Sequence, residues 1–175
     1  MVANAVMVFV MAATPLAMAS CHHGFDRTAE VIQWHVVAMF APSFVTGRLI
    51  TRFGSSQVVL AGLLLCAAAA LVNASGASVA HFRAGLLALG LGWNLAFIGA
   101  TTMLSHAAPE ERATVQGTND FLVFSAVAIA SLLAGVVEHT AGKRAFLGAK
   151  GDRACDFERR ARAVRRPEVI LARLD

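Results

Sequence analysis

Long runs without a charged side chain dominate the sequence. The hydrocarbon core of a bilayer is about 30 Å thick, and a helix needs roughly 20 apolar residues to cross it. Five runs approach or exceed this length, which predicts membrane-spanning helices at residues 2–19, 31–50, 57–72, 82–104 and 119–137. Short polar segments separate the runs, as in antiparallel helix bundles. The predicted fold class is therefore all-α, a polytopic transmembrane helix bundle of about five spans.

Helices are the secondary structure that these runs allow in lipid. An isolated apolar strand would leave its backbone N–H and C=O groups unpaired. The runs also lack the alternation of apolar and polar residues that membrane β-barrels show. A second interpretation exists for the first run, because a signal peptide also has an apolar stretch followed by small residues such as Ala17-Met18-Ala19. No Lys or Arg precedes that run, which favours a retained membrane span.

Composition supports a membrane protein and argues against an enzyme. The chain is 57% hydrophobic and 15% charged, with a mean hydropathy of +0.64. Soluble domains average about 45–50% apolar and about 25% charged residues, so this chain has too few charges to cover a surface that faces water. It contains no glycine-rich phosphate loop, nucleophile elbow or pair of catalytic carboxylates. We expect an integral membrane protein, with no enzymatic activity and no cofactor.

Basic residues are concentrated at the C-terminal end, which divides the chain into two parts. Residues 1–142, the predicted bundle, hold five Arg and six Asp or Glu, whereas residues 143–175 hold ten Lys or Arg and five Asp or Glu. This basic tail could form an amphipathic helix that binds anionic lipid. Alternatively, it is a disordered or frame-shifted addition to the bundle. Because the tail alone accounts for the excess of positive charge, no nucleic-acid partner is expected.

Polar side chains inside spans are expensive in lipid and mark candidate functional positions. Gln33 and His35 lie near the start of the second span, and Trp93 and Asn94 lie near the middle of the fourth. His35 and Met39 are four residues apart and share a helix face, whereas Gln33 points elsewhere. We consider His35, Asn94, Gln33 and Trp93 candidate substrate-binding residues. The alternative is that the polar groups form hydrogen bonds between helices.

Three further patterns concern helix packing and metal binding. A ridge of small residues at every fourth position of the fourth span predicts close helix packing: Ala88, Gly92, Ala96 and Ala100. Pro15 and Pro42 each remove a backbone donor and predict helix kinks. Cys21, His22 and His23 are adjacent, but no second cluster has zinc-ligand spacing, so no metal site is expected.

Short cytoplasmic loops of membrane proteins tend to carry Lys and Arg. Arg48 and Arg52 lie between the second and third spans, and Arg112 lies between the fourth and fifth. Two spans separate these loops, so both lie on one side of the membrane. We predict that this side is cytoplasmic.

The segment Gly47-Arg48-Leu49-Ile50-Thr51-Arg52-Phe53-Gly54 resembles a cytoplasmic-loop signature of the major facilitator superfamily, Gly-x-Leu-x-Asp-Arg-x-Gly-Arg-Lys. Thr51 stands at the position of the Asp, and Ser55-Ser56 stand at the position of the basic pair, as in the weakened copy of the second half of such transporters. Three further segments are similar to the family: 109–117, Thr14-Pro15-Leu16-Ala17-Met18 and Gln33-Trp34-His35.

The resemblance covers about residues 1–140 and implies that the five spans correspond to spans seven to eleven of twelve, in the C-terminal half of a bacterial inner-membrane permease. Such transporters move a small solute by alternating access, with substrate near the midplane between two halves. The resemblance implies that His35 and Asn94 face this site and that Gly47, Arg48, Arg52 and Gly54 belong to a gating loop. The implied partners are the bilayer, a small-molecule solute, a coupling ion, and either the N-terminal half or another helix bundle. The alternative is a non-transporting small membrane protein, or an inactive remnant, that packs with other transmembrane helices.

Overall fold

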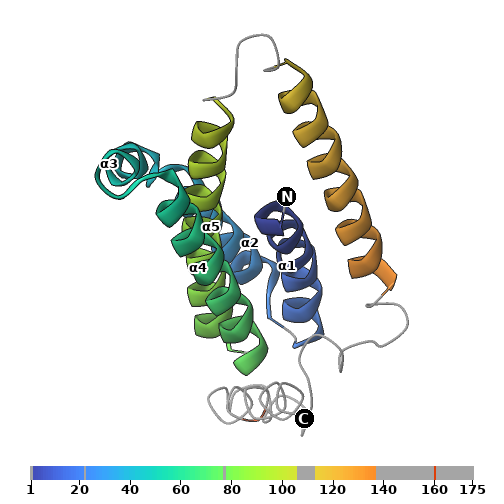
Figure 1. Ribbon diagram of the computed structural model, residues 1–175. Helices are drawn as coiled ribbons and strands as arrows, with labels where there is room; N and C mark the ends of the chain where they lie inside the picture. The colour runs from blue at the N-terminus through green and yellow to red at the C-terminus, as the bar shows by residue number, and fades with distance from the viewer. Residues whose placement is uncertain (1, 22, 77, 106–112, 137–159, 161–175) are drawn as a thin grey trace, which may run out of the picture.

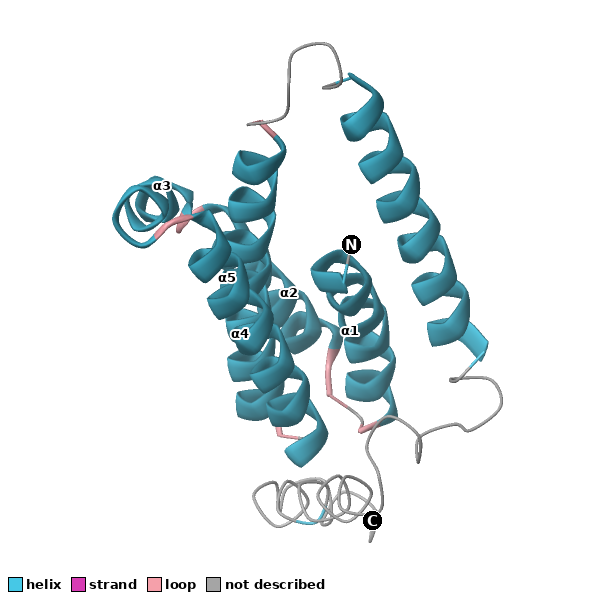
Figure 2. Ribbon diagram, in the orientation of Figure 1, coloured by secondary structure: helices cyan, strands magenta, loops and turns pink. Residues whose placement is uncertain are grey.

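The computed structural model describes residues 2–21, 23–76, 78–105, 113–136 and 160. The labelled helices are α1 (Val2–Ser20), α2 (Phe25–Phe40), α3 (Ser43–Phe53), α4 (Ser55–Ser75) and α5 (Val79–Leu104), and a further helix without a label runs over Ala113–Val136 (Figure 1). These described residues contain no strand (Figure 2). The prediction of an all-α bundle is confirmed.

The helices have the length and hydropathy that membrane spans require. Four stretches are long and apolar enough to cross a membrane: Val2–Ala19 of α1, α4, α5 and Ala113–Val136. α2 and α3 meet the same criterion as a pair, which is bent by 41°. These five helical units correspond in order to the five predicted spans. The chain is therefore a multi-pass helical membrane protein.

The loops are shorter than the sequence pattern predicts. Residues 20–30 and 105–118 were expected to be connections, but α2 already begins at Phe25 and the last described long helix begins at Ala113. Between α3 and α4 only Gly54 remains outside a helix, where six residues were expected. The reason is that charge-free runs mark only the part of a helix that lies in hydrocarbon. A helix can continue into the interface, where its polar side chains are solvated.

α5 is the helix around which the others are arranged. It contacts α1, α2, α3 and α4, and each of these four helices makes its most extensive contact with α5. Figure 1 shows α4 and α5 side by side and antiparallel, with α1 between this pair and helix Ala113–Val136 in that view. The bundle therefore has a close-packed side around α5 and a more open side toward Ala113–Val136.

Small residues allow α4 and α5 to approach closely. A Cβ added at Gly62 of α4 would lie 2.6 Å from the Gly92 carbonyl oxygen and 2.6 Å from the Ala96 nitrogen, both backbone atoms of α5. A Cβ at Gly92 would in turn lie 2.8 Å from the Gly62 carbonyl oxygen. Backbone atoms cannot move aside cheaply, so these positions require glycine. The predicted packing role of the small-residue ridge is confirmed for Gly92 and Ala96.

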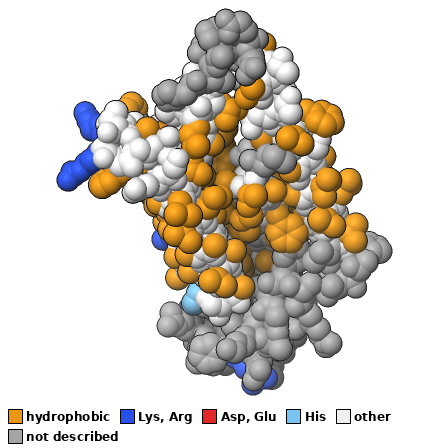
Figure 3. Space-filling view, in the orientation of Figure 1, with side chains coloured by type: hydrophobic (Ala, Val, Ile, Leu, Met, Phe, Trp, Pro, Cys, Tyr) orange, Lys and Arg blue, Asp and Glu red, His pale blue; other side chains and the backbone are white. Residues whose placement is uncertain are grey.

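Apolar side chains cover much of the face shown in Figure 3, over α4, α1 and helix Ala113–Val136. On Ala113–Val136, Phe121, Phe124 and Leu132 are each more than 70% exposed. Water would disfavour such a surface, whereas lipid or other helices would cover it. The predicted basic tail, residues 143–175, lies outside the described residues except for Arg160, and the predicted loop residue Arg112 also lies outside them.

Candidate functional site

The break between α2 and α3 is held in place by Asn94 of α5. Proline at position 42 has no N–H to continue the helix, and the axis bends by 41° there. Asn94 is 2% exposed, and its Nδ2 donates to the Met39 carbonyl oxygen (2.7 Å) and to the Ser43 hydroxyl oxygen (2.8 Å). The Thr46 hydroxyl donates to Asn94 Oδ1 (2.6 Å). One buried amide therefore satisfies polar groups on both sides of the break.

Of the two predicted kinks, only the one at Pro42 interrupts a helix. Pro15 lies inside α1, which continues through it as one helix. The difference follows from what surrounds each proline. At Pro42 a neighbouring helix supplies hydrogen bonds to the groups around the break, and such partners allow a helix to break inside a membrane protein.

His35 lies in the same seam between α2 and α5, about one helical turn before Met39. Its side chain is fully buried, and Nδ1 lies 2.7 Å from the Leu86 carbonyl oxygen. A carbonyl only accepts hydrogen bonds, so Nδ1 carries the hydrogen. The second ring nitrogen, Nε2, has no hydrogen-bond partner within the described residues. Gly90 makes this contact possible, because a Cβ there would lie 2.8 Å from the His35 carbonyl oxygen.

The other two candidate substrate-binding residues lie elsewhere. Gln33 is exposed on the outer face of α2. Trp93 is half-buried, stacks on Phe97 with ring centroids 4.7 Å apart, and donates a hydrogen bond from its indole N–H to Asn4 of α1. The structure thus brings His35 and Asn94 into one seam and places Gln33 and Trp93 outside it. A substrate contact by any of these four candidate residues stays a prediction.

The four gating-loop candidates lie in α3 and its link to α4. Arg48 and Arg52 are exposed. No acidic side chain among the described residues forms an ion pair with either of them. The Arg52 guanidinium lies 5.4 Å from the centre of the Phe53 ring. Gly54 has φ 84° and ψ 151°, a conformation that is essentially restricted to glycine, whereas a Cβ at Gly47 would meet open space. The blue tip in Figure 3 lies over α3.

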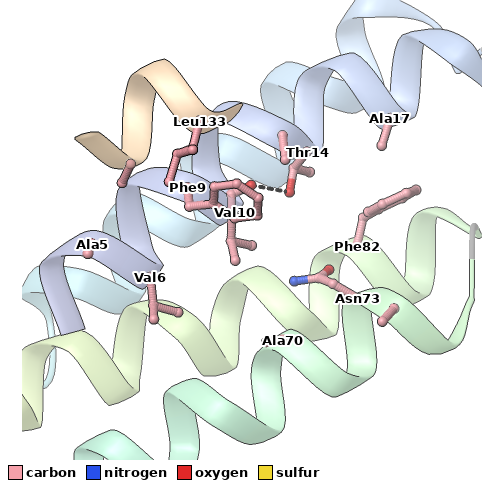
Figure 4. Close-up of a pocket in the computed structure, with 13 residues that line it drawn as sticks. Ala5, Val6, Phe9, Val10, Thr14, Ala17, Ala70, Asn73, Phe82 and Leu133 are labelled. Atoms are coloured by element: carbon pink, nitrogen blue, oxygen red, sulfur yellow. Dashed lines mark hydrogen bonds between the residues drawn. The ribbon is translucent and has the colours of Figure 1, made fainter. Parts of the chain in front are cut away.

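A cavity of about 490 Å³ lies between α1, α4, α5 and helix Ala113–Val136, and the sequence did not predict it. Figure 4 shows its lining, which is mainly alanine and larger apolar side chains and includes the aromatic rings of Phe9 and Phe82. Thr14 and Asn73 supply its polar groups. Of these two residues, the sequence analysis singled out only Thr14, as part of a segment similar to the family, whereas Asn73 lies just after the predicted span 57–72.

Asn73 differs from Thr14 in how its polar atoms are satisfied. The Thr14 hydroxyl donates to the Val10 carbonyl oxygen of its own helix (2.8 Å). Both amide atoms of Asn73, Oδ1 and Nδ2, are buried and lack a hydrogen-bond partner in the described part of the chain. The amide packs against Gly85 of α5, where a Cβ would collide with it. The amide therefore lies against α5 at the edge of the cavity, and its two polar atoms are almost inaccessible from it.

At the end of the bundle opposite Gly54, an ion pair connects α2 and α5. Arg83 donates to the Glu30 carboxylate, which also lies 3.7 Å from Arg27 of its own helix. These side chains are partly exposed, as suits a membrane interface. The residues that the structure describes form no group of three His, Cys, Asp or Glu side chains able to hold a metal, and His22 lies outside them.

These features define a multi-pass membrane protein with polar groups buried between its helices, which is typical of transporters and channels. RfnT, a riboflavin transporter of Brucella anthropi, is 50% identical over 139 residues, 79% of this chain and 35% of that transporter. Two uncharacterized MFS-type transporters of Bacillus subtilis are also similar: YddS is 33% identical over 77% of this chain and 32% of its own length, and YdeG is 36% identical over 75% and 31%.

The chain belongs to the major facilitator superfamily of membrane transporters, as the sequence resemblance implied. It spans about a third of the length of the curated relatives that it matches. No protein-family model matches the chain, and no solved structure matches it either.

Proposed function

We propose that this chain forms part of a transporter that moves a small aromatic solute across the bacterial inner membrane by alternating access, with riboflavin as the first candidate. The observation that carries the proposal is the 50% identity over 139 residues to a riboflavin transporter. Identity at this level extends over four-fifths of the chain and includes most of the helices described above.

The fold supports an assignment to spans seven to eleven of a twelve-span transporter. Of the resembling signature, Gly47 lies inside α3, and Arg52 and Gly54 lie at the junction of α3 and α4, where the second span ends and the third begins. In transporters built from repeats, substrate binds near the midplane between two halves. The proposed partners are therefore the bilayer, the solute, a coupling ion and an N-terminal half that supplies the facing wall.

The exposed arginines of α3 support the proposed gating role. Arg48 and Arg52 lie four residues apart, so they share one helix face. Neither is paired with an acidic side chain among the described residues. An acidic group of the facing half could pair with them in one conformation and release them in the other. Gly54 fixes the turn that presents this face.

An alternative function is that of a non-transporting membrane protein that packs with other helices. The exposed phenylalanine and leucine side chains of helix Ala113–Val136 favour it, because they form an apolar face that another helix could cover. The two functions make different demands on a partner. Transport requires a second half that completes the pathway, whereas packing requires only an apolar surface.

The test is riboflavin uptake into proteoliposomes. The chain is reconstituted alone and together with the N-terminal half of the Brucella anthropi relative. We expect uptake only from the combination, and we expect Arg52→Ala to reduce its rate while Thr51→Ala does not. Uptake by neither preparation, with both polypeptides correctly inserted, would exclude riboflavin transport and favour the packing function. Uptake by the chain alone would show that no second half is needed.

A further inference from the structure

We infer that α3 moves as one unit between two positions, and that the hydrogen bond from Thr46 to Asn94 sets where it holds Arg48 and Arg52. The inference rests on the proposed function, because it names the residues that position the proposed gating arginines. Thr46 is 1% exposed and is the only buried residue of α3. All other residues of this helix are exposed or half-buried. The position of the two arginines therefore depends on one buried contact.

α3 lies between two joints. Ala41 and Pro42 separate it from α2, and Gly54 alone separates it from α4. Hinges are a few residues at the ends of such elements that absorb changes in φ and ψ. Pro42 has no N–H to bond across the first joint. Gly54 has the widest range of φ, and a Cβ added there would meet nothing within 4 Å, so packing does not hold the second joint.

Space for a movement of α3 lies between this helix and its neighbours. An open cavity of about 260 Å³ is lined by residues of α3, α4 and α5: Leu49, Phe53, Gln57, Val58, Ala61 and Leu95. Leu49 and Phe53 can move into this space without displacing another helix. By contrast, α4 and α5 approach so closely at Gly62 and Gly92 that neither position has room for a Cβ. α3 is therefore the loosely packed element beside a rigid pair of helices.

The Thr46 hydroxyl has two acceptors within reach but only one hydrogen. Its oxygen lies 2.6 Å from Asn94 Oδ1 and 3.1 Å from the Pro42 carbonyl oxygen. A hydroxyl has one donor, so the bond to Asn94 ties α3 to α5, whereas the bond to Pro42 stays at the start of α3. A buried hydroxyl without any acceptor would be costly. Because the second acceptor is in place, α3 can shift relative to α5 without that cost.

The other two bonds of Asn94 hold the pivot of the movement. Its Nδ2 donates to the Met39 carbonyl oxygen, near the end of α2, and to the hydroxyl oxygen of Ser43, the first residue of α3. Both acceptors lie next to the first joint, so they are displaced far less than the far end of α3. The movement therefore breaks one interhelical hydrogen bond, the one from Thr46.

Thr46→Val and Thr46→Ser separate the hydroxyl from the shape of the side chain. Valine keeps the branched shape and removes the O–H, whereas serine keeps the O–H. Thr101→Val is the matched control, because the Thr101 hydroxyl donates to the Phe97 carbonyl oxygen of its own helix. We expect only Thr46→Val to change the position of α3.

The experiment measures distances between two spin labels in the full chain in lipid nanodiscs, by double electron–electron resonance. The labels are attached through unnatural amino acids, so the native cysteines stay in place. One pair joins Thr51 of α3 to Leu71 of α4, and a control pair joins Met103 of α5 to Leu71; all three positions are exposed. The first pair should show two distances, and Thr46→Val should raise the fraction of the minor one about threefold, the typical effect of one interhelical hydrogen bond.

Thr46→Ser and Thr101→Val should leave both fractions unchanged, and the control pair should show one distance in every variant. A single distance for the α3 pair throughout would overturn the inference. A shift of the control pair would also overturn it, because the bundle as a whole would then have loosened. An equal response to Thr46→Ser or Thr101→Val would do the same, since the effect would not come from the bond to Asn94.

Riboflavin uptake by the combined halves separates this inference from the proposed function. Thr46→Val should lower the maximal rate about threefold and leave KM unchanged, because it alters the position of the arginines and no solute contact. Uptake with an immobile α3, or an unchanged maximal rate, would overturn the inference and leave the proposed function standing. Two α3 positions that depend on Thr46, without uptake in any preparation, would overturn the proposed function and keep the role of Thr46.

Discussion

The α4–α5 interface and the space beside helix Ala113–Val136 are built in opposite ways. In α5, 44% of the most apolar stretch is buried, against 11% in Ala113–Val136. The first interface brings backbones together at Gly62 and Gly92. On another contact of the same helix, the hydrogen bonds of Asn94 connect α5 to α2 and α3. The second borders an open cavity, beside an amide with no hydrogen-bond partner among the described residues. Lipid does not drive apolar helices together, so close packing and interhelical hydrogen bonds determine which contacts are tight.

The largest expected effect contrasts two glycines on these two sides. Gly62→Ala should lower the free energy of unfolding by about 3 kcal/mol, because its Cβ would lie 2.6 Å from backbone atoms of α5. Gly135→Ala should raise it by about 0.5 kcal/mol, since nothing described lies within 4 Å and alanine favours helix. Reversible unfolding in mixed detergent micelles measures both. A similar response at the two sites would mean that α4 and α5 are not in close contact.

The second prediction concerns the hydrogen bonds at the helix break. Asn94→Ala should lower the free energy of unfolding by about 2 kcal/mol, because it removes the bonds from Asn94 to Met39 and Ser43 and leaves Thr46 with only its bond to the Pro42 carbonyl oxygen. Thr101→Ala, on the exposed face of the same helix, removes only a bond to its own backbone and should change stability by less than about 0.5 kcal/mol. The same unfolding measurement applies. Equal values would contradict the role of Asn94 at the break.

The third prediction separates the two glycines of the gating signature. Gly54→Ala should lower the free energy of unfolding by about 1–2 kcal/mol, because φ 84° is unfavourable for a residue with a Cβ. Position 47 lies inside α3 next to open space. Gly47→Ala should therefore leave the free energy of unfolding unchanged or raise it slightly. Chemical denaturation of both variants provides the comparison. Tolerance of alanine at position 54 would refute the backbone requirement inferred for this turn.

The smallest effect is expected at the ion pair that connects α2 and α5. Glu30→Gln should lower the free energy of unfolding by less than about 1 kcal/mol, because Glu30 and Arg83 are both partly exposed. The effect should shrink further in high salt, which screens exposed charges. Unfolding at two salt concentrations tests this. A loss of several kcal/mol that is independent of salt would place the pair in a far drier environment.

The fold could be predicted from the sequence to a large extent, because lipid requires long apolar helices and charges end the apolar runs. The helix ends were less predictable, as Phe25 and Ala113 show, since helices continue into the interface beyond the last apolar residue. Pro42 correctly marked the break, but its partner Asn94 lies 52 positions away in the sequence, and no local pattern connects the two. The cavity was unpredictable for the same reason. Its lining comes from α1, α4, α5 and helix Ala113–Val136, which are far apart in the sequence.

The position of α5 in the chain order has a consequence for biogenesis. Proteins are synthesised from the N-terminus, and α1 to α4 all make their most extensive contacts with α5. Four helices therefore enter the bilayer before their shared partner leaves the ribosome. Until then, only lipid or an insertion chaperone can shield their contact surfaces. A chain that ended before Val79 would leave these helices unassembled and open to quality-control proteases.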